Sequence, residues 1–119
     1  MLVFNLKKEW FNKIKSGEKT HEYREVKDYW TNRIMKSLYH EYLTNEAYFV
    51  SMCRFGGQKW IKPIFPEIIF RNGYPRSGQK GRELKAIVKK VTIKHGAETD
   101  LRFNGAVYDI EFELIKGNK

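Results

Sequence analysis

The sequence has few of the residues that build disulfide bonds, metal centres and membrane spans. Cys53 is the single cysteine, so an internal disulfide bond is impossible and nothing argues for an oxidising compartment. The three histidines, His21, His40 and His95, lack the paired spacing of a zinc site. No apolar run approaches the roughly 18 residues of a membrane span, and the apolar start is too short for a signal peptide. We expect a cytoplasmic protein without a metal or another cofactor.

Acidic residues are scarce relative to basic ones. The chain has 23 lysines and arginines against 14 aspartates and glutamates, which gives a net charge of +9. A domain this basic indicates a polyanionic partner, nucleic acid before membrane, although it is also compatible with a merely soluble basic protein. The length of 119 residues fits one domain over residues 1–119.

Hydrophobic periodicity predicts an α+β fold. Strands are expected over residues 2–6, 20–26, 47–55, 67–71, 83–95 and 107–115, and helices over 7–16 and 29–43. A change of alternation near Lys89-Lys90 predicts a bulge in the longest strand, as closure of a barrel often requires. Five or six strands with two helices near the N-terminus favour a small mixed β-barrel.

Several side chains have an expected environment. Trp10 belongs to the apolar stripe of the first helix, so it is expected in the core rather than at a ligand. Cys53 lies within an apolar stretch predicted as a strand and is expected to be a buried, inert thiol. Asp109, Glu111 and Glu113 alternate with apolar residues, so we expect them to face outward and pair with lysines of a neighbouring strand.

The corner between the first helix and the strand after it forms the candidate site. Successive side chains of a strand point to opposite faces, so Glu22 and Arg24 share one face while His21 and Tyr23 share the other. Lys19 precedes the strand, and a lysine, a glutamate and an arginine therefore meet within a few ångströms. The alternative is an ordinary solvated face, on which an exposed pair contributes little.

This corner resembles the opening signature of the ASCH domain family. The resemblance rests on a strand over 2–6, a helix over 7–16 and the motif Gly17-x-Lys19-Thr20-x-Glu22-x-Arg24. The segments Val26-Lys27-Asp28-Tyr29-Trp30 and Phe70-Arg71-Asn72-Gly73-Tyr74 are similar to further elements of one branch. The resemblance implies a PUA-like β-barrel associated with RNA, in a small single-domain protein of bacterial or phage type.

The resemblance also raises an enzymatic hypothesis. One ASCH branch hydrolyses N4-acetylcytidine with a lysine at the position of Lys19 and a threonine nucleophile three residues later. Here Glu22 takes that second position, and a carboxylate cannot replace the hydroxyl nucleophile, which argues against a modified-nucleoside amidohydrolase. Some ASCH proteins are reported to be ribonucleases. In that case Glu22 accepts the proton of a 2′-hydroxyl group while Lys19 and Arg24 hold the phosphate, with Tyr23 or His21 assisting.

The first hypothesis is a binding protein for RNA or another nucleic acid. Lys19, Arg24 and Arg33 would contact phosphate, beside Tyr23. Glu22 would orient Arg24 or accept a hydrogen bond from a base amino group. For Arg33 the alternative is a solvated helix face.

A basic segment with many glycines supplies a second set of candidate contacts. Between residues 68 and 82 the sequence has Arg71, Arg76, Lys80 and Arg82 and no acidic residue. Cations neutralise phosphates, and the ring of Tyr74 can stack on a base, as in proteins that bind single strands. The alternative is an ordinary long surface loop.

Two further partners are compatible with the sequence. A modified nucleoside could be the small ligand of the pocket of Lys19, Glu22 and Arg24. The basic face could also bind an acidic protein or a ribonucleoprotein, as small phage-encoded effectors do. No membrane partner is expected.

Overall fold

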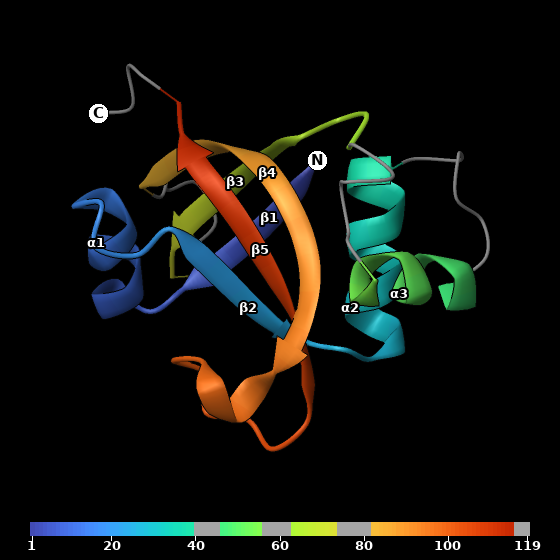
Figure 1. Cartoon of the computed structure of the whole chain (residues 1–119). Helices are drawn as coiled ribbons and strands as arrows, with labels where there is room; N and C mark the ends of the chain where they lie inside the picture. The colour runs from blue at the N-terminus through green and yellow to red at the C-terminus, as the bar shows by residue number, and fades with distance from the viewer. Residues whose placement is uncertain (40–45, 56–62, 74–81, 116–119) are drawn as a thin grey trace.

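The computed structural model is an α+β fold built on one curled sheet (Figure 1). It describes residues 1–39, 46–55, 63–73 and 82–115. In these residues no helix is long and apolar enough to cross a membrane. The strands are β1 (Leu2–Leu6), β2 (His21–Glu25), β3 (Glu67–Asn72), β4 (Glu83–His95) and β5 (Ala106–Leu114). The helical elements are α1 (Lys8–Lys15), α2 (Asp28–Ile34), the π-helical turn η1 (Met35–Tyr39), α3 (Glu46–Arg54) and the 3-10 turn η4 (Gly96–Glu98).

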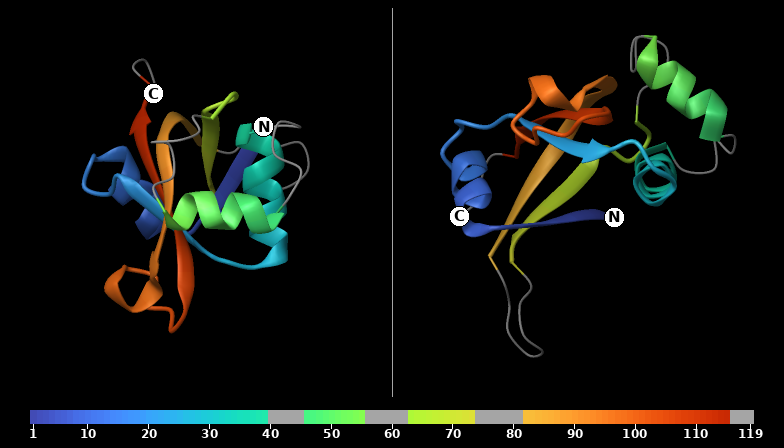
Figure 2. Two further views of the ribbon diagram at one scale, coloured as in Figure 1. Left: turned by 45° about the vertical axis from the view of Figure 1, so that its right-hand side comes forward. Right: turned by 90° about the horizontal axis from the view of Figure 1, so that it is seen from below.

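The five strands form a mixed half-barrel. Their order is β1-β3-β4-β5-β2, with β1 parallel to β3 and the other neighbours antiparallel. Helix α1 lies beside one end of the sheet, and α2 and α3 lie beside the other (Figures 1 and 2). Strands β1 and β2 are the two edges, so the barrel expected from the sequence is an open, curled sheet in the described residues.

The long strand β4 has the predicted irregularity. Its pairing with β5 shifts between Val88, which lies opposite Phe112, and Lys90, which lies opposite Glu111. One extra residue on β4 bends the strand and increases its twist. The predicted bulge is therefore confirmed.

Residues 46–54 form helix α3, so the prediction of a strand over 47–55 is wrong. Aromatic and β-branched residues favoured the strand, but Phe49 and Cys53 are buried four residues apart while Tyr48 is exposed. This spacing is that of one helix face. The ring of Phe49 packs at 5.1 Å from that of Tyr39 and at 6.1 Å from that of Tyr108. Packing therefore overrode the local preference.

Cys53 is buried, as predicted, although it lies on a helix. Only 2% of its surface is exposed, and burial raises the pKa of its thiol to about 12. Because the thiolate is the reactive form, this cysteine is chemically inert at neutral pH.

The predicted second helix is divided in the structure. Asp28 is the first residue of α2, and Lys27 is its N-cap. The π-helical turn η1 continues α2 to Tyr39, and residues 40–45 lie outside the described part of the chain. Ile34 and Leu38 are fully buried four residues apart, so one face of this helical segment packs into the core.

Gly17, after α1, and Gly96, in η4, should differ in how much an alanine substitution destabilises the fold. Gly17 has φ +86° with open space around it, whereas a Cβ at Gly96 would collide with the backbone oxygen of Phe103 and lie 2.9 Å from Val107 Cγ1. We expect Gly17→Ala to lower the free energy of unfolding by about 1 kcal/mol through backbone strain alone. Gly96→Ala should cost about 2–3 kcal/mol because the backbone must shift. Urea unfolding measures both, and equal costs would contradict this account.

Candidate functional site

A pocket of about 550 Å³ opens at the corner between α1 and β2. Its volume is in the range of small-molecule sites. Its wall combines aromatic, basic and acidic side chains from α1, from the corner and β2, and from the loop after η4. The lining residues are Trp10, Lys13, Glu18, Lys19, Thr20, His21, Tyr23, Asp100 and Arg102.

Backbone hydrogen bonds fix the corner that carries Lys19. Gly17 adopts a left-handed conformation that ends α1. The amide of Lys19 then donates to the carbonyl of Lys13 at 3.0 Å, and the carbonyl of Thr20 accepts from the amide of Phe112 on β5 at 3.1 Å. The corner is therefore tied both to α1 and to the sheet, so the position of Lys19 is set by the fold.

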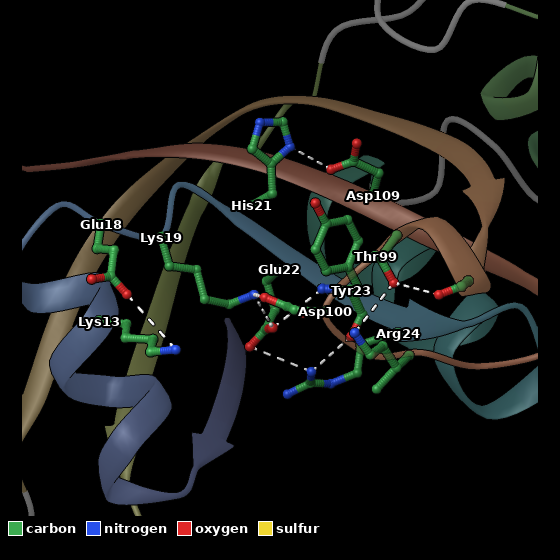
Figure 3. A network of polar contacts seen from close by, with 12 residues as sticks. Lys13, Glu18, Lys19, His21, Glu22, Tyr23, Arg24, Thr99, Asp100 and Asp109 are labelled. Carbon is green, nitrogen blue, oxygen red and sulfur yellow. Dashed lines mark hydrogen bonds and ion pairs between the residues drawn. The ribbon is translucent and has the colours of Figure 1, made fainter.

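Lys19 lines the pocket, and its ammonium group lies beside Glu22 and Asp100 (Figure 3). Its Nζ is 2.6 Å from Asp100 Oδ2 and 3.6 Å from Glu22 Oε1, and only 8% of the residue is exposed. The same atom lies 4.8 Å from the ring centre of Tyr23 and 5.6 Å from that of Trp10. Two carboxylates and two ring faces thus surround one buried cation, which is the arrangement that a buried charge requires.

Glu22 and Arg24 lie on the other face of β2 from His21 and Tyr23, as the alternation predicts (Figure 3). The predicted cluster is present, since Arg24 Nη1 is 3.4 Å from Glu22 Oε2. Glu22 is only 4% exposed, and neither residue of the pair lines the pocket. Glu22 therefore supports Lys19 from beneath the pocket.

Arg24 joins the two edges of the half-barrel. Its guanidinium lies 4.8 Å from the ring centre of Phe4 on β1 and 5.0 Å from that of Trp30 on α2. Only 17% of its side chain is exposed. Cation–π contacts of this kind stabilise partly buried arginines. This geometry gives Arg24 a structural role beneath the pocket, and its contact with phosphate stays a prediction.

The outer face of β2 carries a second polar group. His21 Nδ1 is 2.6 Å from Asp109 Oδ1, and Lys94 Nζ is 2.6 Å from Asp109 Oδ2. The hydrogen bond to Asp109 raises the pKa of Lys94. Pairing of Asp109 with a lysine of a neighbouring strand is confirmed, but Asp109 is only 3% exposed, so the expectation that it faces solvent is wrong. The histidine and lysine partners make its burial tolerable.

Tyr23 lies beside this group and keeps its proton at neutral pH. Its ring stacks on His21 at 6.3 Å with an angle of 12°. Burial raises the pKa of its hydroxyl group, and the negative charge of Asp109 raises it further. The residue is therefore a neutral hydrogen-bond donor with a ring face toward the pocket cation.

Other predicted contact residues lie away from this pocket. Arg71 donates through Nε and Nη2 to Glu83 Oε2 at 2.8 and 2.6 Å, so its charge is paired although residues 68–82 contain no acidic residue. Arg33 is exposed on α2 and lies over the ring of Tyr29 at 5.3 Å, which is a helix-surface contact. Arg82 is exposed just before β4. Three predicted residues, Tyr74, Arg76 and Lys80, lie outside the described residues.

Several residues of the pocket were not anticipated as site residues, among them Trp10, Asp100 and Arg102. Trp10 packs against the core, as predicted, but it is only partly buried and also lines the pocket. Asp100 and Arg102 belong to a loop without a recognisable motif. Asp100 follows Lys19 by 81 residues in the sequence. Arg102 has φ +49°, an uncommon conformation for a residue other than glycine. Such strained residues concentrate at functional sites.

A double-mutant cycle tests whether Lys19 and Asp100 are coupled. Lys19→Met, Asp100→Asn and the double variant should show a coupling energy of about 1–3 kcal/mol in urea unfolding, because the lysine is buried. Lys13 and Glu18 form a matched control pair that is 3.7 Å apart and exposed, with an expected coupling of at most about 0.5 kcal/mol. Equal couplings for the two pairs would show that burial does not strengthen the Lys19 pair.

Neither a metal site nor a known relative identifies the function of this pocket. In the parts of the chain that the structure describes, no three histidine, cysteine, aspartate or glutamate side chains gather closely enough to hold a metal ion. Comparison with family models, curated proteins and solved structures found no match to this chain. The functional argument therefore rests on the geometry of the pocket.

Proposed function

We propose that the protein is a small ASCH-like, PUA-like domain that binds single-stranded RNA in the pocket at the corner of α1 and β2. The observation that carries the proposal is the combination of ring faces with cations in one pocket. The rings of Trp10 and Tyr23 lie close to Lys19, and Lys13 and Arg102 add two more cations to the lining. Stacking on rings together with neutralisation of phosphates is how proteins bind unpaired strands.

The charges of the pocket leave one cation available for phosphate. Asp100 pairs with Lys19, and Glu18 pairs with Lys13. The side chain of Arg102 is exposed and has no ion pair or hydrogen bond among the described residues. An arginine can hold a phosphate group with two parallel hydrogen bonds. We therefore assign the first phosphate contact to Arg102, with Lys13 as the next candidate because its exposed pair is weak.

The net charge supports a polyanion over an uncharged ligand. An excess of nine positive charges raises the local concentration of a nucleic acid strand around the whole domain. A free modified nucleoside would use the rings and Lys19 but would gain nothing from Arg102. An acidic protein would use the charges but not a pocket of nucleotide size. RNA is the ligand that uses both features.

Binding of a fluorescein-labelled single-stranded RNA should weaken steeply as salt rises, because bound phosphates displace counterions. Arg102→Ala should lower the affinity and reduce the slope of log K against log salt by about 0.7, the value for one lost phosphate contact on a single strand. Arg33→Ala removes the same charge from an exposed site outside the pocket and is the matched control. Fluorescence anisotropy at several salt concentrations measures both quantities.

Three results would count against this proposal. Affinity that does not depend on salt would exclude a phosphate-dominated interface. Equal losses for Arg102→Ala and Arg33→Ala would show that net charge matters and the pocket does not. A free nucleoside that competes as well as the oligonucleotide would replace RNA with a nucleoside as the ligand.

A further inference from the structure

The contact between Lys19 and Asp100 places a hydrogen-bond donor beside an acceptor in the wall of the pocket. Lys19 Nζ lies 2.6 Å from Asp100 Oδ2, both residues line the pocket, and Figure 3 shows the two groups side by side. Arg102 and Lys13 carry the proposed phosphate contacts. The pair of Lys19 and Asp100 is therefore left for another part of a nucleotide.

Asp100 keeps acceptor capacity after it has bound Lys19. Its side chain is 40% exposed, and within the described residues its Oδ1 atom accepts no hydrogen bond. Each carboxylate oxygen accepts about two hydrogen bonds, so Oδ2 can take a second donor beside the ammonium group. A ligand with two neighbouring N–H groups therefore satisfies both oxygens at once.

Lys19 also keeps a donor for a ligand. An ammonium group has three N–H donors, of which Asp100 Oδ2 takes one, and Glu22 Oε1 lies at the ion-pair distance of 3.6 Å. The ring centres of Tyr23 and Trp10 lie 4.8 and 5.6 Å from Nζ, and both residues line the pocket. An acceptor atom of a base that stacks on these rings therefore comes within reach of the ammonium group.

The pair presents one donor and then two acceptors, namely Lys19 Nζ, Asp100 Oδ2 and Asp100 Oδ1. The Watson–Crick edge of guanine has the complementary order, because O6 accepts while N1–H and N2–H donate. Adenine and cytosine each have a single amino group on this edge, which leaves one carboxylate oxygen unpaired. Uracil would place its O2 atom against that oxygen, and two acceptors repel each other. Proteins read this edge in unpaired RNA bases.

We propose that the pocket selects guanine in single-stranded RNA, with Asp100 and Lys19 as the specificity-determining residues. The inference rests on the proposed binding of RNA and adds which base enters the pocket. Asp100 accepts from N1–H and N2–H, Lys19 donates to O6, and the nearby rings of Trp10 and Tyr23 supply the stacking surface. Discrimination arises because every other base leaves a carboxylate oxygen unpaired or repelled.

The first test changes the base and leaves the protein as it is. Fluorescence anisotropy compares an oligouridine strand with a strand of the same length that has one central guanosine, which should bind about 10–100-fold more tightly. Inosine at that position lacks only the N2 amino group and should weaken binding about tenfold relative to guanosine. The control base, 7-deazaguanosine, keeps the Watson–Crick edge and should bind within about twofold of guanosine.

The second test changes the carboxylate. Asp100→Asn replaces one acceptor with a donor, so the ratio of the affinities for the two strands should fall to within about twofold of one. Both affinities come from the same protein, so a fraction of unfolded molecules cancels in the ratio. If this variant does not fold at all, inosine tests the same hydrogen bond in the unmodified protein.

Glu25→Gln is the matched control for the loss of one paired carboxylate. Glu25 does not line the pocket, its side chain is 37% exposed, and its Oε2 atom is 3.3 Å from Lys27 Nζ. This variant should keep the preference for guanosine.

Equal affinity of the unmodified protein for the two strands would overturn the inference and leave the binding of RNA standing. A loss with 7-deazaguanosine as large as that with inosine would move recognition to another edge of the base and remove the roles of Asp100 and Lys19. An unchanged preference in Asp100→Asn would also overturn those roles. If neither strand binds, the proposed function and this inference fall together.

Discussion

The pocket depends on the contact between Lys19 and Asp100, which joins two distant parts of the chain. The lysine comes from the corner after α1, and the aspartate comes from the loop after η4. Removing the lysine would leave Glu22 with one fewer cation in a buried position, and an unpaired buried charge is costly. The ion pair therefore holds the loop of Arg102 beside the rings of α1 and β2. Backbone hydrogen bonds within the loop, from Arg102 to Thr99 and from Phe103 to Gly96, fix its own shape.

An open sheet makes this arrangement possible. Strands β1 and β2 are the edges of the half-barrel and are not hydrogen-bonded to each other. Side chains connect them instead, because Arg24 on β2 lies over the ring of Phe4 on β1. The ring of Trp30 on α2 packs against the same guanidinium group. The inner face of β2 thus contributes Glu22 and Arg24 to the structure, while its outer face contributes His21 and Tyr23 to the pocket. The two faces of the five-residue strand β2 thus have different roles: one stabilises the pocket from beneath, and the other lines it.

Local patterns predicted the parts of the fold and the site that depend on neighbouring residues. Alternation located the strands and separated Glu22 from Tyr23, and the glycine after α1 located the corner. The same patterns failed for α3, where aromatic composition masked a helical spacing of Phe49 and Cys53. They could not find Asp100, because its pairing with Lys19 spans 81 residues and depends on how the sheet curls. The burial of Asp109 was missed for a similar reason, since its partners lie on two other strands.

The central claim is that a strand of RNA occupies the pocket at the corner of α1 and β2. The most direct measurement is a ¹H–¹⁵N NMR titration with a short single-stranded RNA oligonucleotide. The account predicts that the indole N–H signal of Trp10 and the amide signals of Thr20 and Arg102 shift first and saturate together. The indole signal of Trp30, which lies beneath Arg24, should stay in place. Shifts centred on Trp30 and α2, with Trp10 unchanged, would contradict the account.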